Sequence, residues 1–353
     1  MTKQNGPNNR ENTFIYRCIS EIIGCVNMLC QTIANQTRNE VNSSEFKEEA
    51  RRNTTDFTRN RKMSLEELVI FVLMSFKCST SSALRRFFSN ISKLIFMTQQ
   101  SLSEARSKIA VRAFVRLFII TVKVMTEHCT NKWNGYRIYA IDGSKISLPA
   151  DKKLCEHFGA LGKDKTAPTA QGSILYDVLN DIVVDAAIEP LATDERTLAK
   201  NHINACKSIA PDDKKIIILD RGYASFDLIE TLENEGIFYL IRVRSKFNND
   251  IDNQTVADGY VWLKQGDKCM NVRVVKFMLN SGEEEVLITN IKDKRLGISA
   301  FKKLYFMRWP IEVKYDIVKN KLQLENFNTR TVEGIQQDFF AGVEIKIFGN
   351  YVR

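Results

Sequence analysis

The pattern of apolar and polar residues changes character near residue 136. Before that point, apolar positions recur at helical spacing, and Ser64 with Glu67 forms a capping box directly before the apolar run that begins at Leu68. Further helices are predicted over residues 14–29, 79–88 and 101–128. The first third of the chain is therefore predicted to be helical, with a loosely held start.

After residue 136 the pattern alternates between strands and helices. Apolar, β-branched runs bounded by turn residues predict strands at 136–141, 173–179, 182–188, 215–219 and 237–243. Helical spacing predicts helices at 194–209, 226–235, 299–325 and 332–348. Residues 244–297 carry only short alternating runs and are predicted to be a small β insertion. This order predicts an α/β protein with a mixed sheet.

The positive charge of the chain is concentrated in its N-terminal third. Residues 1–135 hold 20 Lys and Arg against 11 Asp and Glu, whereas residues 136–353 hold 31 of each, so the net charge of +9 arises from the first segment. A polyanion-binding arm and an ordinary solvated basic surface explain this equally well. One face of the predicted 101–128 helix is a candidate surface for the DNA backbone. Its residues are Lys108, Arg112, Arg116 and Lys123.

Composition excludes several classes of protein. Apolar residues make up 44% of the chain, which excludes wholesale disorder and collagen-like structure. The longest apolar run, 68–74, is too short to span a bilayer, and the first 20 residues lack the apolar core of a signal peptide, so we expect a soluble, intracellular protein. The eight Cys and three His show no metal-binding spacing, which predicts reduced, buried thiols.

Three carboxylates are candidates for metal binding. Asp142 and Asp220 each follow a predicted strand, and Glu312 lies in the predicted 299–325 helix. Strand ends in an α/β sheet bring distant carboxylates together, and hard cations such as Mg²⁺ prefer carboxylate oxygens. Taken alone, however, aspartates after strands more often cap helices or start turns.

A series of polar residues surrounds Glu312. Steps of three, four and seven residues place the series on one face of a helix, where a buried helix would carry Leu or Ile. Its members are Tyr305, Arg308, Glu312 and Lys319. An exposed amphipathic helix with an ion pair between Arg308 and Glu312 is the alternative. Pro310 interrupts the series, and it predicts either a kink or the start of a new helix.

Together these motifs resemble the DDE transposases of the IS4 type, the group that includes the Tn5 and Tn10 enzymes. The resemblance rests on Ile-Asp-Gly-Ser at Asp142, Leu-Asp-Arg-Gly-Tyr at Asp220 and the Tyr-Arg-Glu-Lys series, with 78 and 92 residues between successive carboxylates. It implies a ribonuclease H-like mixed-sheet catalytic core with an inserted small β domain, preceded by a helical DNA-binding region. The expected segments are a partly helical N-terminal region (1–60), a helical DNA-binding region (61–135), the first part of the core (136–243), the β insertion (244–297), the second part of the core (298–340) and a C-terminal helix (341–353).

The resemblance also implies a reaction and its partners. Asp142, Asp220 and Glu312 are expected to hold two Mg²⁺ ions, for which Mn²⁺ can substitute, while Tyr305, Arg308 and Lys319 contact phosphates at the DNA end. The protein is expected to bind terminal inverted repeats in the bacterial cytoplasm, to cut the element's DNA with water and to join its 3′ end to target DNA. Relatives of the Tn5 and Tn10 kind pass through a DNA hairpin and act as homodimers on paired DNA ends.

Some expectations remain open at this point. Trp262 in the β insertion is a candidate platform for a flipped base, although an ordinary place in the β core is the favoured interpretation. Related enzymes continue with further helices, so truncation of this chain after residue 353 is a hypothesis. A DNA-binding inhibitor without catalysis and a host nuclease of the same fold are the alternative functions.

Overall fold

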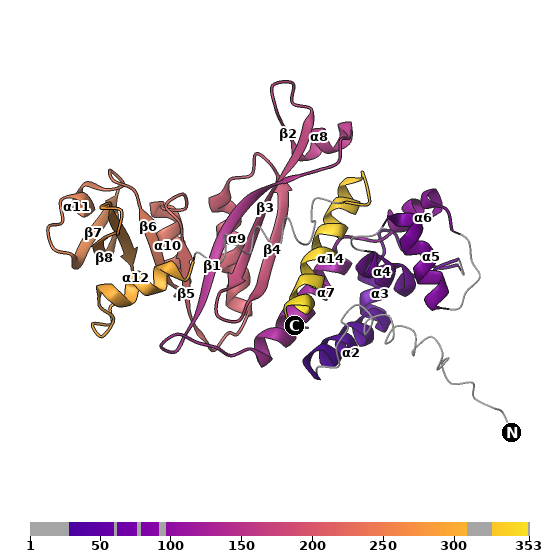
Figure 1. The fold of residues 1–353 in the computed structure, drawn as a ribbon, viewed down its shortest axis with the longest axis horizontal. Helices are drawn as coiled ribbons and strands as arrows, with labels where there is room; N and C mark the ends of the chain where they lie inside the picture. The colour runs from indigo at the N-terminus through magenta and orange to yellow at the C-terminus, as the bar shows by residue number, and fades with distance from the viewer. Residues whose placement is uncertain (1–27, 60–61, 76–78, 92–96, 309–326, 352–353) are drawn as a thin grey trace. The chain divides into compact units, whose positions relative to one another are not determined.

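The computed structural model describes residues 28–59, 62–75, 79–91, 97–308 and 327–351, and it forms two compact units (Figure 1). The helical unit comprises the described residues of 1–128, 146–170 and 318–353. The sheet unit comprises those of 129–145 and 171–317. Within the described residues, no helix has the length and apolar character needed to cross a membrane.

The helical unit is built from helices that precede and follow the sheet in sequence, together with one short helix between its first two strands. They are α2 (Met28–Asn42), α3 (Ser44–Ala50), α4 (Leu65–Met74), α5 (Thr80–Asn90), α6 (Gln99–Arg106), α7 (Arg112–His128), α8 (Lys152–Phe158) and α14 (Val332–Tyr351). Helices α2 and α14 pack on α7, and α14 also contacts α4. The C-terminal helix predicted from the sequence is confirmed, and it joins the N-terminal helices in one core.

Local signals and buried polar contacts fix these helices. The capping box at α4 is confirmed, since Ser64 N donates to Glu67 at 2.9 Å and Glu67 N donates to the Ser64 hydroxyl at 3.2 Å. Arg106 at the end of α6 is buried and binds α14 through Gln337 at 2.7 Å and Asp338 at 2.6 Å. This charged contact ties residues more than 200 positions apart.

The basic face predicted on the 101–128 segment is largely occupied by contacts within the helical unit. Lys108 pairs with Glu104 at 3.1 Å, Arg112 donates to backbone carbonyls of α3 and Arg51, and Arg116 pairs with acidic residues of α2 and α3. The same segment also divides into α6 and α7 rather than forming one helix. Three of the four cations in this stripe thus have partners within the unit, whereas Lys123 is exposed on α7, and contact of this face with the DNA backbone stays a prediction.

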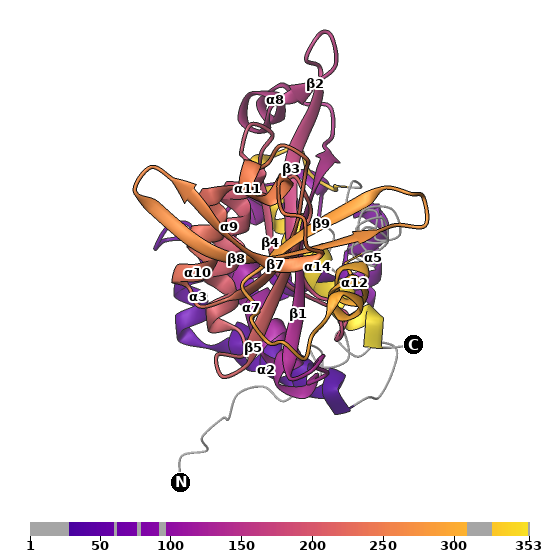
Figure 2. The same cartoon turned by 90° about the vertical axis from the view of Figure 1, so that its left-hand side faces the viewer.

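The strands form one mixed sheet with parallel strands at its centre, and all of them except β2, the end of β1 and the start of β3 belong to the sheet unit. The strands are β1 (Tyr136–Ser147), β2 (Ala160–Leu161), β3 (Ala167–Asp177), β4 (Ile182–Pro190), β5 (Lys214–Leu219), β6 (Phe238–Val243), β7 (Asp258–Gln265), β8 (Lys268–Met278) and β9 (Glu284–Thr289). Their order is β2-β3-β1-β5-β6-β9-β8-β7, with β4 beside β3. Strands β1, β5 and β6 run parallel, whereas β9, β8 and β7 continue antiparallel (Figure 2). The predicted ribonuclease H-like α/β fold is confirmed.

Segment 244–297 forms the strands that its alternating pattern predicts. Strand β9 pairs antiparallel with β6, so β7, β8 and β9 extend the main sheet by completing the hydrogen bonds of the β6 edge. A short helix, α11 (Asn249–Asp252), precedes them.

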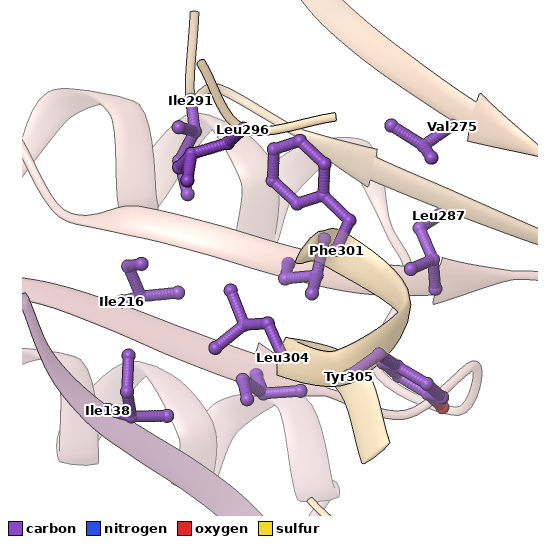
Figure 3. Close-up of a cluster of buried hydrophobic side chains, with 11 residues drawn as sticks. Ile138, Ile216, Val275, Leu287, Ile291, Leu296, Phe301, Leu304 and Tyr305 are labelled. Carbon is purple, nitrogen blue, oxygen red and sulfur yellow. The ribbon is translucent and has the colours of Figure 1, made fainter. Parts of the chain in front are cut away.

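Helices cover both faces of the sheet. On β6, Leu240 packs in a cluster with α12 (Ile298–Phe306), whereas the neighbouring Tyr239 donates its hydroxyl to Glu233 of α10 (Phe226–Asn234) at 3.1 Å. Adjacent strand residues point to opposite faces, so α12 and α10 lie on opposite sides. Helix α9 (Glu195–Ser208) contacts α10 and β4. Figure 3 shows Phe301, Leu304 and Tyr305 of α12 packed against the sheet core.

Candidate active site

Asp142 and Asp220 are placed side by side by the register of the parallel strands. Tyr136 of β1 lies beside Lys214 of β5, and the pairing continues in step to Ala140, so each β1 residue faces the residue 78 positions later. Asp142 and Asp220 are also 78 positions apart. Because neighbouring strands are about 4.8 Å apart, extending this register by two residues places Asp142, which lies inside β1, beside Asp220, which directly follows β5. The expectation that a strand ends just before Asp142 is wrong, because β1 continues through this residue to Ser147.

Two side chains pack closely against the main chain next to Asp142. The carboxylate Oδ1 of Asp142 accepts a hydrogen bond from Gly143 N at 3.0 Å. A Cβ at position 143 would lie 2.9 Å from Gln171 Nε2 and 3.1 Å from Glu195 Oε1. Glycine is therefore needed here because two side chains approach the backbone directly beside the metal-ligand candidate.

The N-terminus of α9 adds a third acidic residue to this site. Glu195 is its first residue, and its Oε1 accepts a hydrogen bond from Gln171 Nε2 at 3.3 Å. The next residue, Arg196, donates through Nε and Nη2 to the Gly222 carbonyl at 3.3 and 3.2 Å. Helix α9 thereby contacts both the Asp142 segment and the turn that follows Asp220.

Tyr223, at the end of the Asp-Arg-Gly-Tyr motif, lies among these carboxylates. The residue is 2% exposed, and its hydroxyl has no hydrogen-bond partner among the described residues. Burial raises the pKa of the phenol well above its usual value, and the negative charges of Asp142, Glu195 and Asp220 raise it further, opposed by Arg308. The phenol therefore stays protonated and offers a donor to any oxygen that enters the site.

Tyr305 and Arg308 also lie near Asp220. They come from the face of the sheet that α12 covers. Burial raises the pKa of Tyr305, the Arg308 cation opposes this, and the charge of Asp220 adds to it. The Arg308 guanidinium carbon lies 5.8 Å from the Tyr305 ring centre, within the range of a cation–π contact. The structure therefore brings this half of the predicted polar series to Asp220.

The helix that carries Tyr305 is shorter than its sequence predicts. Helix α12 ends at Phe306 with Met307 as its C-cap, and Arg308 lies beyond it. The expectation of one helix over 299–325 is wrong, because Pro310 lacks a backbone donor and disfavours helical geometry in the residue before it. The interruption predicted from Pro310 is thus present. Glu312 and Lys319 lie outside the described residues.

Trp262 does not lie in the β core. It is 58% exposed on β7, the strand at the edge of the sheet, and Tyr260 on the same face is 44% exposed. The favoured interpretation from sequence is therefore wrong, because the alternation of β7 points Val261 and Leu263 inward and the two aromatic rings outward.

The described acidic residues fit part of a divalent-metal site. The carboxylates of Asp142 and Asp220 are the oxygen donors that Mg²⁺ and Mn²⁺ prefer. The buried Tyr223 hydroxyl, which has no partner among the described residues, can donate to an oxygen bound there. Among the described residues, no three His, Cys, Asp or Glu side chains are grouped closely enough to hold an ion. The third carboxylate of the predicted set, Glu312, is not among them.

Sequence reasoning missed Glu195, Gln171 and Tyr223 as site residues. The sequence could have identified Tyr223, since this residue belongs to the motif that begins at Asp220. Glu195 looked like a first-turn acid of a helix, which is a common position for Glu, and Gln171 had no distinguishing neighbour. Their association with the site depends on strand register and on the placement of α9.

Comparison with known proteins identifies a family and a structural relative. Residues 133–343 match the family described as the transposase DDE domain. No curated protein sequence matches this chain. Among solved structures, one similar chain is the piggyBac transposase in a synaptic complex with hairpin DNA, studied by cryo-electron microscopy. The TM-score is 0.48 at 11% sequence identity, and the similarity covers 99% of this chain and 78% of that chain.

Proposed function

Because this chain belongs to the transposase DDE domain family, which it matches over residues 133–343, we propose that it is the transposase of an insertion sequence. It binds the terminal inverted repeats of the element, cuts the DNA at their tips and joins the freed 3′ ends to target DNA. The observation that carries the proposal is the register of β1 and β5, whose offset of 78 residues equals the spacing of Asp142 and Asp220.

Asp142, Asp220 and Glu312 are the residues proposed to hold the metal. Ions of Mg²⁺ or Mn²⁺ held there, two in number, would activate the attacking oxygen and stabilise the leaving oxygen of a phosphodiester. Gly143 N orients the Asp142 carboxylate by donating to Oδ1, and the absence of a side chain at Gly143 lets Gln171 and Glu195 close around it.

Cations and phenols of the site are proposed to hold the DNA phosphates. Arg308 presents a planar guanidinium that can donate two hydrogen bonds to one phosphate, and its packing beside Tyr305 limits the orientations that it samples. Lys319 supplies a further positive charge in the proposal. Tyr223, held protonated by burial and by nearby carboxylates, donates to an oxygen of the scissile group.

The DNA-binding part of the proposal rests on cations outside the 101–128 stripe. Arg85 and Arg86 are exposed on α5, next to the buried Phe87 and Phe88 that anchor this helix. Their exposure leaves both guanidinium groups accessible to the DNA backbone, whose neutralisation makes binding salt-dependent. We propose that two protomers pair the two ends of the element.

The exposed aromatic face of β7 supports a role in handling distorted DNA. Trp262 and Tyr260 project from the same face of an edge strand, where an unstacked base can reach them. Base stacking on an aromatic ring contributes about 1–3 kcal/mol. We propose that Trp262 is the platform for a base displaced near the cleaved end.

The proposal is tested with the full chain, Mg²⁺ or Mn²⁺, and DNA that carries the inverted repeats flanking its coding region. We expect nicking at the repeat tip, and loss of at least 1,000-fold in rate, on the order of 4 kcal/mol, for Asp142→Asn and Asp220→Asn. Asp212→Asn is the matched control, since Asp212 is exposed just before β5, at the opposite end of that strand from Asp220. Binding without any cleavage would indicate an inhibitor, and cleavage indifferent to the repeat would indicate a nuclease.

A further inference from the structure

A chain of buried hydrogen bonds leads from β4 through α9 to the backbone of Asp142. His202 of α9 contacts Asp185 of β4 through Nδ1 at 2.8 Å and the Ser173 hydroxyl of β3 through Nε2 at 2.9 Å. The Ser173 hydroxyl in turn donates to the carbonyl oxygen of Asp142 at 3.3 Å. Three side chains from three elements therefore end at a residue of the proposed metal site.

These residue types match those of a hydrolytic triad, but burial excludes that role. Ser173 and His202 are each 1% exposed, so no substrate carbonyl can approach the serine oxygen. The serine hydroxyl also has a second partner, the carbonyl oxygen of Asp142, at 3.3 Å. A buried, fully connected polar chain of this kind fixes the geometry of its members instead.

His202 is the central member of this hydrogen-bonded chain, with one partner at each ring nitrogen. When Ser173 donates to the Asp142 carbonyl, its oxygen accepts a proton from His202 Nε2. On the other side of the ring, Nδ1 lies 2.8 Å from the Asp185 carboxylate. Asp185 is the outer end of the chain, since its side chain is 29% exposed.

Helix α9 connects this chain to the rest of the site. His202 lies seven residues after Glu195, two turns along the same helix face, and Glu195 closes on Gly143. Anchoring the middle of α9 to β3 and β4 therefore also sets the position of its N-terminus beside Asp142.

We propose that Asp185, His202 and Ser173 are positioning residues, which hold the backbone of Asp142 so that its carboxylate keeps the orientation needed for metal binding. The inference rests on the proposed function, in which Asp142 is a metal ligand. Removing a partner of a metal ligand typically weakens metal affinity about 10- to 100-fold. Interrupting this chain of hydrogen bonds should therefore raise the metal concentration needed for half-maximal cleavage. The cleavage rate at saturating metal should stay nearly unchanged.

The first test measures Mn²⁺ binding by electron paramagnetic resonance and the Mn²⁺ dependence of cleavage for the full chain. We expect Ser173→Ala and Asp185→Asn each to raise the half-saturating Mn²⁺ concentration about 10-fold. The double variant should be no weaker than Ser173→Ala alone, because both changes interrupt one chain. The control Thr289→Val removes another buried hydroxyl that donates to a strand carbonyl, that of Tyr239, and it should leave the Mn²⁺ dependence unchanged.

The second test follows backbone hydrogen exchange by mass spectrometry and does not depend on activity. Ser173→Ala and Asp185→Asn should speed exchange in peptides covering residues 140–146, and Thr289→Val should not. Asp185→Asn preserves the size of a side chain that is partly exposed, so this variant should fold normally. It therefore still tests backbone exchange at residues 140–146 when Ser173→Ala folds poorly.

The outcomes separate this inference from the proposed function. Unchanged exchange at 140–146 in both variants, or an Mn²⁺ dependence that matches Thr289→Val, would overturn the inference. A wild-type chain that binds no Mn²⁺ and cuts no DNA would overturn the proposed function, whereas faster exchange in the variants would still establish the positioning of Asp142.

Discussion

Glu344 is a buried carboxyl group whose ionisation should oppose folding. It lies on α14 at 1% exposure, and its Oε1 accepts a hydrogen bond from the Thr121 hydroxyl of α7 at 3.3 Å. Burial raises the pKa of Glu344 from 4.5 to about 8, and the Thr121 hydrogen bond only partly opposes this. The folded helical unit therefore holds Glu344 as a neutral acid at pH 7, whereas the unfolded chain exposes it as a carboxylate.

The magnitude follows from the difference between the two pKa values. Because the folded-state pKa is the higher one, stability is fully present below pH 4.5 and is lost as the pH rises to about 8. The loss is about 1 kcal/mol at pH 5 and about 3 kcal/mol at pH 7, from 1.36 kcal/mol per pKa unit. Glu344→Gln is neutral at every pH and keeps a polar group near Thr121, so it should be more stable than the wild type by about these amounts.

The assay is urea unfolding of both proteins at pH 5 and pH 7, followed by circular dichroism at 222 nm. Tryptophan fluorescence is unsuitable because all three tryptophans lie between residues 129 and 317, within the sequence limits of the sheet unit. Glu333→Gln is the matched control on the same helix, since Glu333 is 40% exposed and pairs with Arg52 at the surface. Surface pairs contribute about 0–1 kcal/mol, so the control should show little change.

Two results would refute this reasoning. One is a Glu344→Gln variant that is less stable than the wild type at pH 7, which would mean that the carboxylate itself is stabilised in the fold. The other is a stability difference that stays the same at pH 5 and pH 7, which would mean that ionisation of Glu344 does not contribute.

Two further predictions concern the sheet unit. Arg137→Met should destabilise it by about 3–5 kcal/mol, because the buried Asp177, which Arg137 contacts at 3.1 Å, loses its charge partner. Urea unfolding followed by tryptophan fluorescence measures this loss of stability, and a loss below about 1 kcal/mol would contradict the prediction. Trp262→Ala should slow a late step of DNA end processing about 10-fold without lowering the melting temperature, because an exposed ring contributes little to the core. A large drop in melting temperature together with normal end processing would instead mean that Trp262 is structural. Tyr260→Ala, on the same face of β7, tests the role of this aromatic face independently.

Much of the sheet was predictable because its signals are local. The apolar run at 215–219 matches β5 within one residue, and the hairpin expected from the runs on either side of Asn180-Asp181 is the β3–β4 pair. The spacing of 78 residues between Asp142 and Asp220 can be read from the sequence. Only the pairing of β1 with β5 shows that paired residues of these strands have the same spacing. The fate of the basic stripe was not predictable, because the partners of Arg112 and Arg116 come from α2 and α3.

The sequence by itself determined the α/β class, the placement of Asp220 directly after a strand, the family resemblance and the interruption of the helix near Pro310. Each depends on residues close together along the chain or on a motif of fixed spacing. Only the tertiary structure decided that Glu195 and Tyr223 join Asp142, that Trp262 faces outward and that Ser173 and His202 hold the Asp142 backbone. These relations are set by strand register and helix packing, in which residues distant in sequence meet, and no local pattern encodes which of many similar side chains will do so.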